Sequence, residues 1–409
     1  MANYIRRDME GIVLELDTQY PVILVTGPRQ VGKTTMLQTL MRGTERRYVS
    51  LDDLTNRSLA RTDPAMFFQL HKPPVLVDEV QYAPELFAQI KIIADRDRKA
   101  GAFWLTGSQV FKLMRGVRES LAGRVALLEL SSCSQNEILG RGKNIPFTTD
   151  FEALRERQNE SPVTDVSEIF RRIHKGGMPA LVSGQYRDNG VFYSSYLNTY
   201  LERDIRELSG DIDSVRFLRF VTSAACRCAQ MLNISDIAQD SDIGQSTAKN
   251  WLNILETLGV VFYLHPYSNN TLKRTVKTPK LYFFDCGLVA YLAKWSSPET
   301  LESGAMSGAI LENYVVSEIV KSYRNAAKTP FLYYYRDKDM REIDLILEAD
   351  GRLSPIEIKK TASPDKRLTN VFKTLDRSGK KRGNGAVLCM ARELSALDAE
   401  NYVVPIGLL

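Results

Sequence analysis

The sequence predicts a multidomain α/β protein, and three observations carry that prediction. The chain has 409 residues, which is more than one hydrophobic core usually spans. Residues 27–34 form a phosphate-loop pattern between an apolar run and a helical pattern, which is typical of a parallel sheet covered by helices. Strand and helix patterns alternate again toward the C-terminus, after a mostly helical middle. We therefore expect about two to four domains.

The phosphate-loop motif indicates a nucleotide site. Residues 27–34 match GxxxxGK[ST], directly after the apolar run 22–25 and before the helical pattern 35–41. Backbone N–H groups at such a helix start bind phosphates, a lysine adds positive charge, and a hydroxyl binds Mg²⁺. We expect ATP and Mg²⁺ as cofactors, since an ordinary glycine-rich turn explains neither Lys33 nor Thr34. The predicted nucleotide-binding residues are Gly27, Pro28, Arg29, Gln30, Val31, Gly32, Lys33, Thr34 and Thr35, with Thr34 also a metal ligand.

Two carboxylates, Asp78 and Glu79, end a buried strand pattern. After a phosphate loop, the first acid of such a pair holds Mg²⁺ through water, and the second polarises the water that attacks the γ-phosphate. We therefore assign Asp78 to the metal and Glu79 to catalysis. The next strand pattern, 102–106, ends in small polar residues, at the edge where parallel sheets bind ligands. Ser108 or Gln109 is expected to orient the water and sense the γ-phosphate, with a simple turn as the alternative.

Arg124 lies directly before a fifth strand pattern, residues 125–130. With five strands, the Asp-Glu pair, a polar sensor and this arginine, the first part of the chain resembles the AAA+ class of P-loop ATPases. The resemblance implies that Arg124 reaches the γ-phosphate of a neighbouring subunit, so that a homo-oligomer is the expected assembly. A salt-bridged arginine on the surface is the alternative.

The middle of the chain predicts a linker, a helical lid and a further helical unit. Residues 143–165 are polar and weakly periodic, which indicates an insertion or linker. The AAA+ resemblance implies that the helical patterns up to residue 208 form a lid over the nucleotide. From residue 215 to 264 the patterns follow the order of a winged helix. The side chains that its last helix would present to DNA are Gln245, Thr247, Lys249 and Asn250. DNA is therefore a candidate partner, although winged helices also bind proteins.

A second group of charged residues lies near the C-terminus. A helix pattern contains Glu312, and the strand patterns after it contain Asp344 and then Glu357 and Lys359. Alternation along a strand puts Glu357 and Lys359 on one face. If Asp344 lies on the neighbouring strand, the acids hold Mg²⁺ and Lys359 orients a water for phosphodiester cleavage. The alternative is a pair of charged strands outside a structural core.

This order of elements, followed by a helix at 365–375 and a strand at 385–390, resembles the restriction-endonuclease-like fold, PD-(D/E)XK. The whole chain is similar to a prokaryotic family of AAA+ ATPases that ends in such a domain, whose function is uncharacterised. The segments that carry this likeness are residues 27–34, 51–53, 77–81, 105–109, 176–177, 280–287, 311–313 and 357–359. The expected units are an ATPase core at 1–142, a linker and helical lid at 143–212, a winged helix at 213–275 and a restriction-endonuclease-like domain at 276–409.

Composition limits the class of protein. Apolar residues make up 44% of the chain and charged residues 25%, which is typical of globular proteins. The five cysteines show no paired zinc pattern and no dense disulfide framework, and no apolar run approaches the length of a membrane span. We therefore expect a cytoplasmic protein with no membrane partner. The formal net charge of +5 arises from residue 271 on, which favours contact with nucleic-acid phosphates in that part of the chain.

Together these patterns favour an ATPase that couples hydrolysis to DNA binding or remodelling. Mg²⁺-dependent DNA cleavage at the C-terminal acids is a further activity that the patterns leave open. The alternative is a nucleotide-controlled oligomeric switch or scaffold, whose C-terminal domain binds partners without catalysis. DNA-stimulated ATP turnover separates the two functions.

Overall fold

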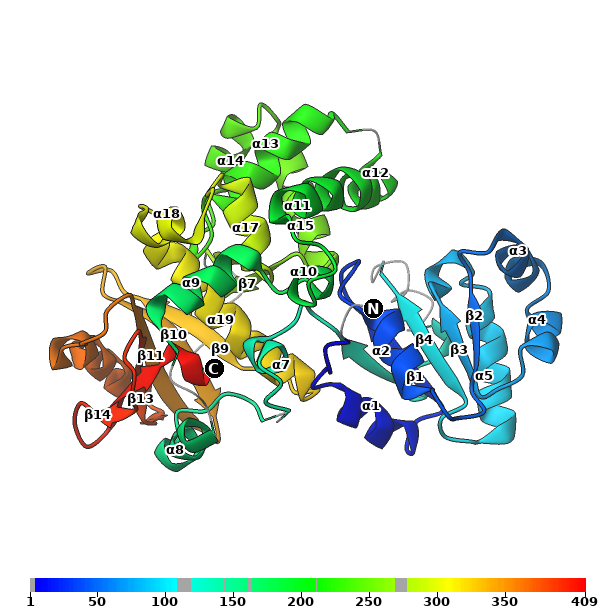
Figure 1. Cartoon of the computed structure of the whole chain (residues 1–409), viewed down its shortest axis with the longest axis horizontal. Helices are drawn as coiled ribbons and strands as arrows, with labels where there is room; N and C mark the ends of the chain where they lie inside the picture. The colour runs from blue at the N-terminus through cyan, green and yellow to red at the C-terminus, as the bar shows by residue number, and fades with distance from the viewer. Residues whose placement is uncertain (1–3, 109–118, 143–144, 161–163, 211, 269–277) are drawn as a thin grey trace.

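The computed structural model describes residues 4–108, 119–142, 145–160, 164–210, 212–268 and 278–409. Within these ranges the chain forms three sheets. The N-terminal and C-terminal sheets lie toward opposite ends of the long axis, and the helices of the middle segment lie beside and between them (Figure 1).

The N-terminal unit is a five-stranded sheet in the order β2-β3-β4-β1-β5, in which neighbouring strands run parallel. The strands are β1 (Val22–Thr26), β2 (Arg47–Ser50), β3 (Val75–Asp78), β4 (Phe103–Gly107) and β5 (Val125–Glu129). The helices of this unit are α1 (Glu10–Asp17), α2 (Lys33–Leu40), α3 (Leu54–Thr62), α4 (Pro64–Leu70), α5 (Leu86–Asp97) and the short η1 (Val80–Tyr82). This arrangement confirms the predicted parallel sheet.

Both faces of this sheet are buried. Leu24 packs in one hydrophobic cluster with residues of α4 and α5, whereas its neighbour Val25 packs in another with residues of α1 and α2. Side chains alternate across a strand, so an apolar strand with no polar alternation needs cover on both sides. The second cluster continues into the middle and C-terminal segments, which ties the nucleotide-binding half to the rest of the chain.

Helices dominate the segment between the first and last sheets. The early ones are α7 (Gln135–Ile138), α8 (Phe151–Glu160), α9 (Val166–Lys175), α10 (Pro179–Val182), α11 (Asn189–Tyr196), the π-helical turn η2 (Leu197–Leu201) and α12 (Glu202–Ser209). The later ones are α13 (Ser214–Ala225), α14 (Ile234–Asp240), α15 (Gln245–Thr257), α17 (Cys286–Leu292) and α18 (Pro298–Ser303). We call residues 166–299 the middle unit.

The segment 143–165, predicted as an insertion or linker, contains helix α8 within its described residues. Leu154 of this helix is fully buried. The Phe151 ring centroid lies 4.7 Å from that of Tyr402, near the end of the chain. The sequence pattern missed this helix because it buries few apolar side chains and so has a weak period.

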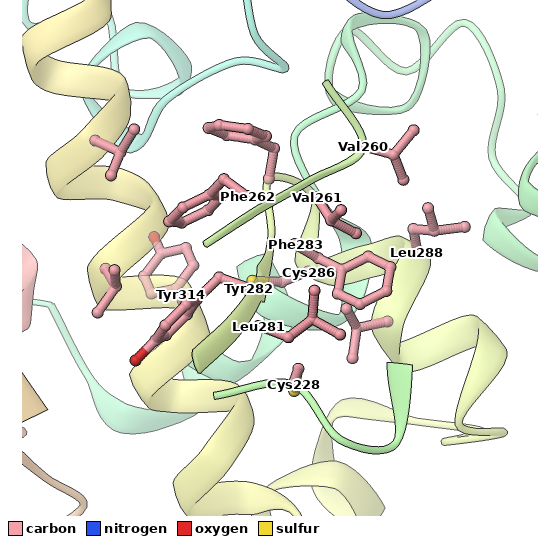
Figure 2. Packing of buried hydrophobic residues seen from close by; sticks show 14 of the residues in the cluster. Cys228, Val260, Val261, Phe262, Leu281, Tyr282, Phe283, Cys286, Leu288 and Tyr314 are labelled. Atoms are coloured by element: carbon pink, nitrogen blue, oxygen red, sulfur yellow. The ribbon is translucent and has the colours of Figure 1, made fainter. Parts of the chain in front are cut away.

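The middle unit contains a small antiparallel sheet in the order β6-β8-β7. Its strands are β6 (Gln230–Met231), β7 (Val261–Leu264) and β8 (Lys280–Phe283). The central strand β8 lies beyond the domain boundary expected at residue 275, yet it pairs with both strands that precede that boundary. Figure 2 shows side chains of β7 and β8 packed beside Cys286 and Leu288 of α17 and Tyr314. This core joins the middle unit to the C-terminal one.

The C-terminal unit begins with the long helix α19 (Ser307–Asn325), which covers a mixed sheet in the order β14-β15-β13-β11-β10-β9. The strands are β9 (Leu332–Arg336), β10 (Glu342–Ala349), β11 (Arg352–Lys359), β13 (Gly385–Cys389), β14 (Ser395–Ala396) and β15 (Asn401–Pro405), with β12 (Lys381–Arg382) paired to β11. The short helix η4 (Ile406–Leu408) follows β15. Strands β9, β10 and β11 pair antiparallel, whereas β11, β13 and β15 pair parallel.

The helix predicted at 365–375 is a 3₁₀-helix, η3 (Lys366–Ser378). Its buried side chains are Thr369, Phe372 and Leu375, which are three residues apart. Residues i and i+3 stand one above another in a 3₁₀-helix, so this spacing puts all three on the sheet-facing side. The sequence pattern located the helix but did not indicate its 3₁₀ winding.

Candidate functional site

The phosphate loop joins β1 to α2, and its backbone requires glycine at two positions. Gly27 has φ +135° and Gly32 has φ +89°, a range that favours glycine. A Cβ at Gly27 would lie 2.0 Å from the backbone oxygen of Leu130. These residues therefore let the loop turn tightly under the end of the sheet.

Lys33 lies inside this loop and is 6% exposed. Its Nζ donates to the backbone oxygens of Gly27, at 3.0 Å, and Pro28, at 2.7 Å. Burial lowers the pKa of the Lys33 ammonium to about 8, against the opposing effect of Glu79. The Lys33 ammonium thus bonds two uncharged carbonyl groups, at the position where the motif predicts a contact with phosphate.

Asp78 meets Thr34 at the end of β3. The Thr34 hydroxyl donates to Asp78 Oδ1 at 2.6 Å, so the two predicted Mg²⁺ ligands lie side by side. Thr106, at the end of β4, also donates to Oδ1, and the Tyr48 hydroxyl donates to Oδ2 at 3.1 Å. Sequence reasoning missed Thr106 and Tyr48, although the position of Thr106 at the end of the adjacent strand was a usable signal.

Glu79 has a left-handed backbone, with φ +57°, which turns its side chain away from the strand. The Ser108 hydroxyl donates to Glu79 Oε2 at 3.4 Å, so the predicted sensor lies beside the predicted base. Gln81, which sequence reasoning missed, donates to the same oxygen through its side-chain nitrogen. Gln109, the other sensor candidate, lies outside the described residues.

The middle unit contacts the phosphate loop at two places. Arg29 forms a two-pronged ion pair with Asp204 of α12, with Nε–Oδ2 at 2.8 Å and Nη2–Oδ1 at 2.9 Å. Both side chains are largely buried. Pro28 packs against Gly259, where a Cβ would lie 3.1 Å from Pro28 Cδ. The motif predicted neither contact, because both partners lie far along the chain.

A cavity of about 450 Å³ opens beside the loop and α2. Residues of the N-terminal segment, of the loop and α2, and of the α10 region line it. They include Ile5, Gln30, Val31, Gly32, Thr35 and Pro179. The remaining predicted nucleotide-binding residues therefore face one cavity.

Arg124 lies on the surface of the single chain, away from these groups. Its guanidinium pairs with Asp95 of α5, with Nη2–Oδ2 at 2.9 Å. This is the surface ion pair that the sequence left as an alternative, and the contact with a second subunit stays a prediction.

The C-terminal acids gather on α19, β10 and β11. Lys359 Nζ lies 2.6 Å from Glu357 Oε1 and 3.3 Å from Asp344 Oδ2. Asp344 Oδ2 also accepts a bond from the Ile358 backbone N–H at 2.8 Å. The predicted common face of Glu357 and Lys359, with Asp344 on the neighbouring strand, is confirmed.

Glu312 of α19 faces the same region but has partners from β8. Lys280 Nζ lies 2.9 Å from Glu312 Oε1, and the Tyr282 hydroxyl donates to the same oxygen at 2.7 Å. Burial and the charge of Asp344 raise the pKa of Glu312 to about 7, and the same two causes raise the pKa of Glu357 to about 7. Sequence reasoning missed Lys280 and Tyr282 as partners of this site, because the contact joins segments about 30 residues apart in the chain.

The two sites offer different groups to a metal ion. In the part of the chain that the structure describes, no three acids, histidines or cysteines form a ready cation site. Mg²⁺ needs only one or two carboxylates, because it keeps several waters. Thr34 with Asp78 fits that need, and so does the acidic group, where Glu357 Oε2 is buried without a hydrogen-bond partner.

No helix within the described ranges has the length and apolar character to cross a membrane. Three family models match the chain. Residues 19–139 match an AAA domain, residues 166–299 match a domain of unknown function (DUF8612), and residues 307–409 match another domain of unknown function (DUF4143). The AAA match, with the parallel sheet and the phosphate loop, supports an AAA-type ATPase unit at the N-terminal end.

Whole proteins that resemble this chain say less about its function than the AAA-domain match does. Uncharacterized proteins of Mycobacterium bovis and Mycobacterium tuberculosis are each 29% identical over 361 residues, which cover 88% of this chain and 75% of theirs. A Walker-type ATPase of Pyrococcus abyssi overlaps 71% of this chain and 96% of its own, at 16% identity and a TM-score of 0.43. The RuvB Holliday junction branch migration motor of Thermotoga maritima overlaps 63% and 89%, at 15% identity and a TM-score of 0.32. Both scores are below the level that indicates a shared fold.

Proposed function

We propose that this chain is an ATPase whose hydrolysis cycle acts on DNA. The observation that carries the ATPase part is the contact of Thr34 with Asp78 at 2.6 Å, with Glu79 next in the chain. The proposed metal-binding pair and the proposed base thus lie close together beside the phosphate loop. The AAA-domain match over residues 19–139 supports the same conclusion.

In the proposed reaction, N–H groups at the start of α2 bind the phosphates, and Lys33 exchanges its carbonyl partners for phosphate oxygens. Thr34 and Asp78 would hold Mg²⁺, which neutralises charge that develops on the phosphates. Glu79 accepts a hydrogen bond from the attacking water, and Ser108 helps to orient that water. The cavity beside Gly32 receives the nucleoside, since about 300–1,000 Å³ is the usual volume of a small-molecule site.

We propose that Arg124 completes the nucleotide site of a neighbouring subunit in a homo-oligomer. Its pair with Asp95 keeps the guanidinium on the surface, where a second subunit can reach it. A γ-phosphate would replace Asp95 as its partner, because an arginine fork binds either group with two hydrogen bonds.

We propose that the described residues of 213–283, which are 213–268 and 278–283, form a winged helix that contacts DNA. The order α13, β6, α14, α15, β7, β8 and the antiparallel sheet support this proposal. On α15, Gln245, Lys249 and Asn250 are exposed and Thr247 is half-buried, as a recognition helix requires.

We further propose that the C-terminal unit is restriction-endonuclease-like and cleaves DNA with Mg²⁺. The order of α19, three antiparallel strands, η3 and β13 supports it, as does the convergence of Asp344, Glu357 and Lys359. Asp344 and Glu357, with Glu312 nearby, would hold Mg²⁺, which polarises the phosphodiester. Lys359 holds the attacking water in place.

ATP turnover with and without single-stranded, duplex and branched DNA tests the proposal. Lys33→Ala should abolish ATP turnover. The control is Lys72→Ala, which should leave turnover unchanged because Lys72 is exposed and precedes the amino end of β3. DNA should raise the turnover of the wild type. Unchanged turnover in Lys33→Ala would refute the ATPase site.

Nicking of supercoiled DNA in Mg²⁺ tests the C-terminal part, with Asp344→Ala and Lys359→Ala as the variants. Both should lose nicking, and equal nicking by all three proteins would expose a contaminant. Nucleotide-dependent oligomers with neither nicking nor DNA-stimulated turnover would favour the alternative, a nucleotide-controlled switch or scaffold.

A further inference from the structure

Lys280 is a charged side chain at the junction of two units, and it is 3% exposed. It belongs to β8 of the middle unit, whereas its partners belong to the C-terminal unit. Its Nζ lies 2.9 Å from Glu312 Oε1 and 2.6 Å from Glu342 Oε1, and the Tyr334 ring centroid is 5.7 Å away. The ammonium therefore bridges two carboxylates from separate elements, α19 and β10.

Tyr282 strengthens this arrangement from the same strand. Alternate residues of a strand share a face, so Lys280 and Tyr282 both point toward α19, and both donate to Glu312 Oε1. Figure 2 shows the Tyr282 ring extending toward that helix. Two donors of one strand thus occupy one carboxylate oxygen of Glu312, which is one of the acids proposed above to hold Mg²⁺.

The rest of the acidic group is only partly satisfied. Lys359 bridges Asp344 and Glu357, but Glu357 Oε2 is buried and has no hydrogen-bond partner among the described residues. A buried carboxylate oxygen without a partner costs free energy until water or a cation reaches it. Within the ranges that the structure describes, Glu357 therefore keeps one carboxylate oxygen without a protein partner, whereas Lys280 donates to Glu312.

We infer that Lys280 takes the place of a divalent cation between Glu312 and Glu342, and that its charge weakens metal binding at the acidic site. The inference rests on the Mg²⁺ role proposed for that site. A positive charge a few ångströms from a cation site weakens cation binding, and burial strengthens the effect because the surroundings screen it less.

The fold holds Lys280 in this position. Strand β8 is the central strand of the sheet β6-β8-β7. The Asn313 side chain of α19 bonds the backbone N–H of Phe283 on this strand at 2.8 Å and its carbonyl at 3.0 Å. The backbone contacts of β8 therefore keep the charge of Lys280 beside Glu312, in addition to the ion pair itself.

Mn²⁺ binding to the full chain without nucleotide tests the inference, measured by titration calorimetry and by the spin resonance of free Mn²⁺. Lys280→Met keeps an unbranched side chain and removes the charge. We expect the Kd for Mn²⁺ to fall at least about tenfold relative to the wild type. The gain should vanish in the double variant Lys280→Met/Asp344→Ala. An unchanged or larger Kd in Lys280→Met overturns the inference.

Lys321→Met is the matched control. Lys321 Nζ pairs with Glu318 Oε1 at 3.0 Å on the same helix α19, and the side chains of Lys321 and Lys280 are both 4% exposed. This variant loses a buried ammonium away from the acidic site, so its Kd for Mn²⁺ should stay within about twofold of the wild type. A tenfold gain in Lys321→Met as well would overturn the inference, because any buried lysine would then give it.

A second variant keeps the test decisive if circular dichroism shows that Lys280→Met does not fold. Lys280→Gln removes the charge but keeps a side-chain N–H that can donate to Glu312. We expect its Kd for Mn²⁺ to fall at least about threefold, because both carboxylates stay in place without the competing ammonium. No change in this folded variant overturns the inference.

The outcome separates the inference from the proposed nuclease activity. Tight Mn²⁺ binding by Lys280→Met without nicking of DNA supports the inference and removes the nuclease part of the proposed function. If the wild type nicks DNA in a metal-dependent way and binds Mn²⁺ as tightly as Lys280→Met, the nuclease part of the proposed function is supported and the inference is overturned.

Discussion

The nucleotide site and the C-terminal acidic site each receive a charged side chain from the middle unit, and the two charges have opposite signs. At the phosphate loop, α12 supplies Asp204 to Arg29. At the acidic site, β8 supplies Lys280 to Glu312. Asp204 thus neutralises an arginine of the phosphate loop, and the ammonium of Lys280 lies between two carboxylates. The middle unit therefore supplies a counter-charge to both sites.

The two sites also use their own lysines differently. Lys33 donates to neutral carbonyl groups, and burial lowers its pKa to about 8. For Lys359 burial opposes the charges of Asp344 and Glu357, and the net effect raises its pKa. An anion that reaches Lys33 therefore relieves a buried positive charge, whereas Lys359 already has its counter-charges. Lys33 therefore has a charge that a phosphate can neutralise, whereas the charges of the acidic site largely neutralise one another.

The largest expected effect tests whether the two sites are chemically independent. Glu79→Gln keeps the size of the side chain but removes the base, so ATP turnover should fall about a thousandfold while ATP still binds. Mn²⁺ binding at the acidic site should not change. Turnover is measured by phosphate release, and nucleotide affinity by fluorescence of a labelled ATP analogue. Turnover close to the wild-type value would mean that Glu79 is not the base.

The next largest effect is expected when a substitution breaks the contact between the middle unit and the phosphate loop. Asp204→Asn removes the carboxylate from a largely buried ion pair, so the free energy of unfolding should fall by about 3 kcal/mol. A non-hydrolysable ATP analogue should raise the unfolding temperature more in this variant than in the wild type, because Arg29 no longer has to leave a carboxylate. Thermal unfolding with and without the analogue measures both quantities.

Glu202→Gln is the control for Asp204→Asn. Glu202 lies on the same helix and pairs with the exposed Arg206, so the free energy of unfolding should change by less than about 0.5 kcal/mol. An equal shift by the ATP analogue in the wild type and in Asp204→Asn would contradict competition between Asp204 and phosphate.

Sequence patterns predicted the main charged groups that each site contributes itself, but not the charged groups that the middle unit adds. Lys33 and Asp78 are marked by a local motif, and Asp344 and Glu357 by the ends and alternation of strands. Asp204 and Lys280 act on residues far along the chain, and their positions depend on how helices and sheets pack. No local spacing encodes such a contact.

Some residues in the segments that carry the family likeness support the fold rather than a catalytic step. A Cβ at Gly177 would lie 2.5 Å from the backbone oxygen of Cys133, so this position needs glycine for close packing. The Asn313 side chain bonds the backbone N–H of Phe283 at 2.8 Å and its carbonyl at 3.0 Å. Asp285 accepts bonds from Gly177 N at 2.8 Å and from the Tyr193 hydroxyl at 2.6 Å. A sequence motif alone does not distinguish these roles from catalytic ones.

A smaller effect concerns how the nucleotide site holds its base. Gln81 donates to Glu79 Oε2, and its other side-chain atom, Oε1, is buried without a partner in the described structure. Gln81→Ala should lower kcat about tenfold with little change in KM, because Gln81 orients Glu79 rather than binding ATP. Gln81→Asn, which keeps the amide on a shorter side chain, should recover part of the rate. A rise in KM at unchanged kcat would instead mark Gln81 as a binding residue.

The smallest effect on stability is expected at an exposed ion pair of the nucleotide unit, in contrast to the two buried contacts that the middle unit makes. Asp95→Asn breaks the ion pair with Arg124, which is exposed to solvent, so thermal unfolding should not change measurably. The same change frees Arg124 for a neighbouring subunit. Turnover per chain should therefore rise as the protein concentration increases, and it should do so at a lower concentration than in the wild type. Arg124→Ala should remove that dependence while leaving the unfolding temperature unchanged. If turnover per chain is the same at every concentration in all three proteins, Arg124 acts only as a surface ion pair, and each nucleotide site works without a neighbour.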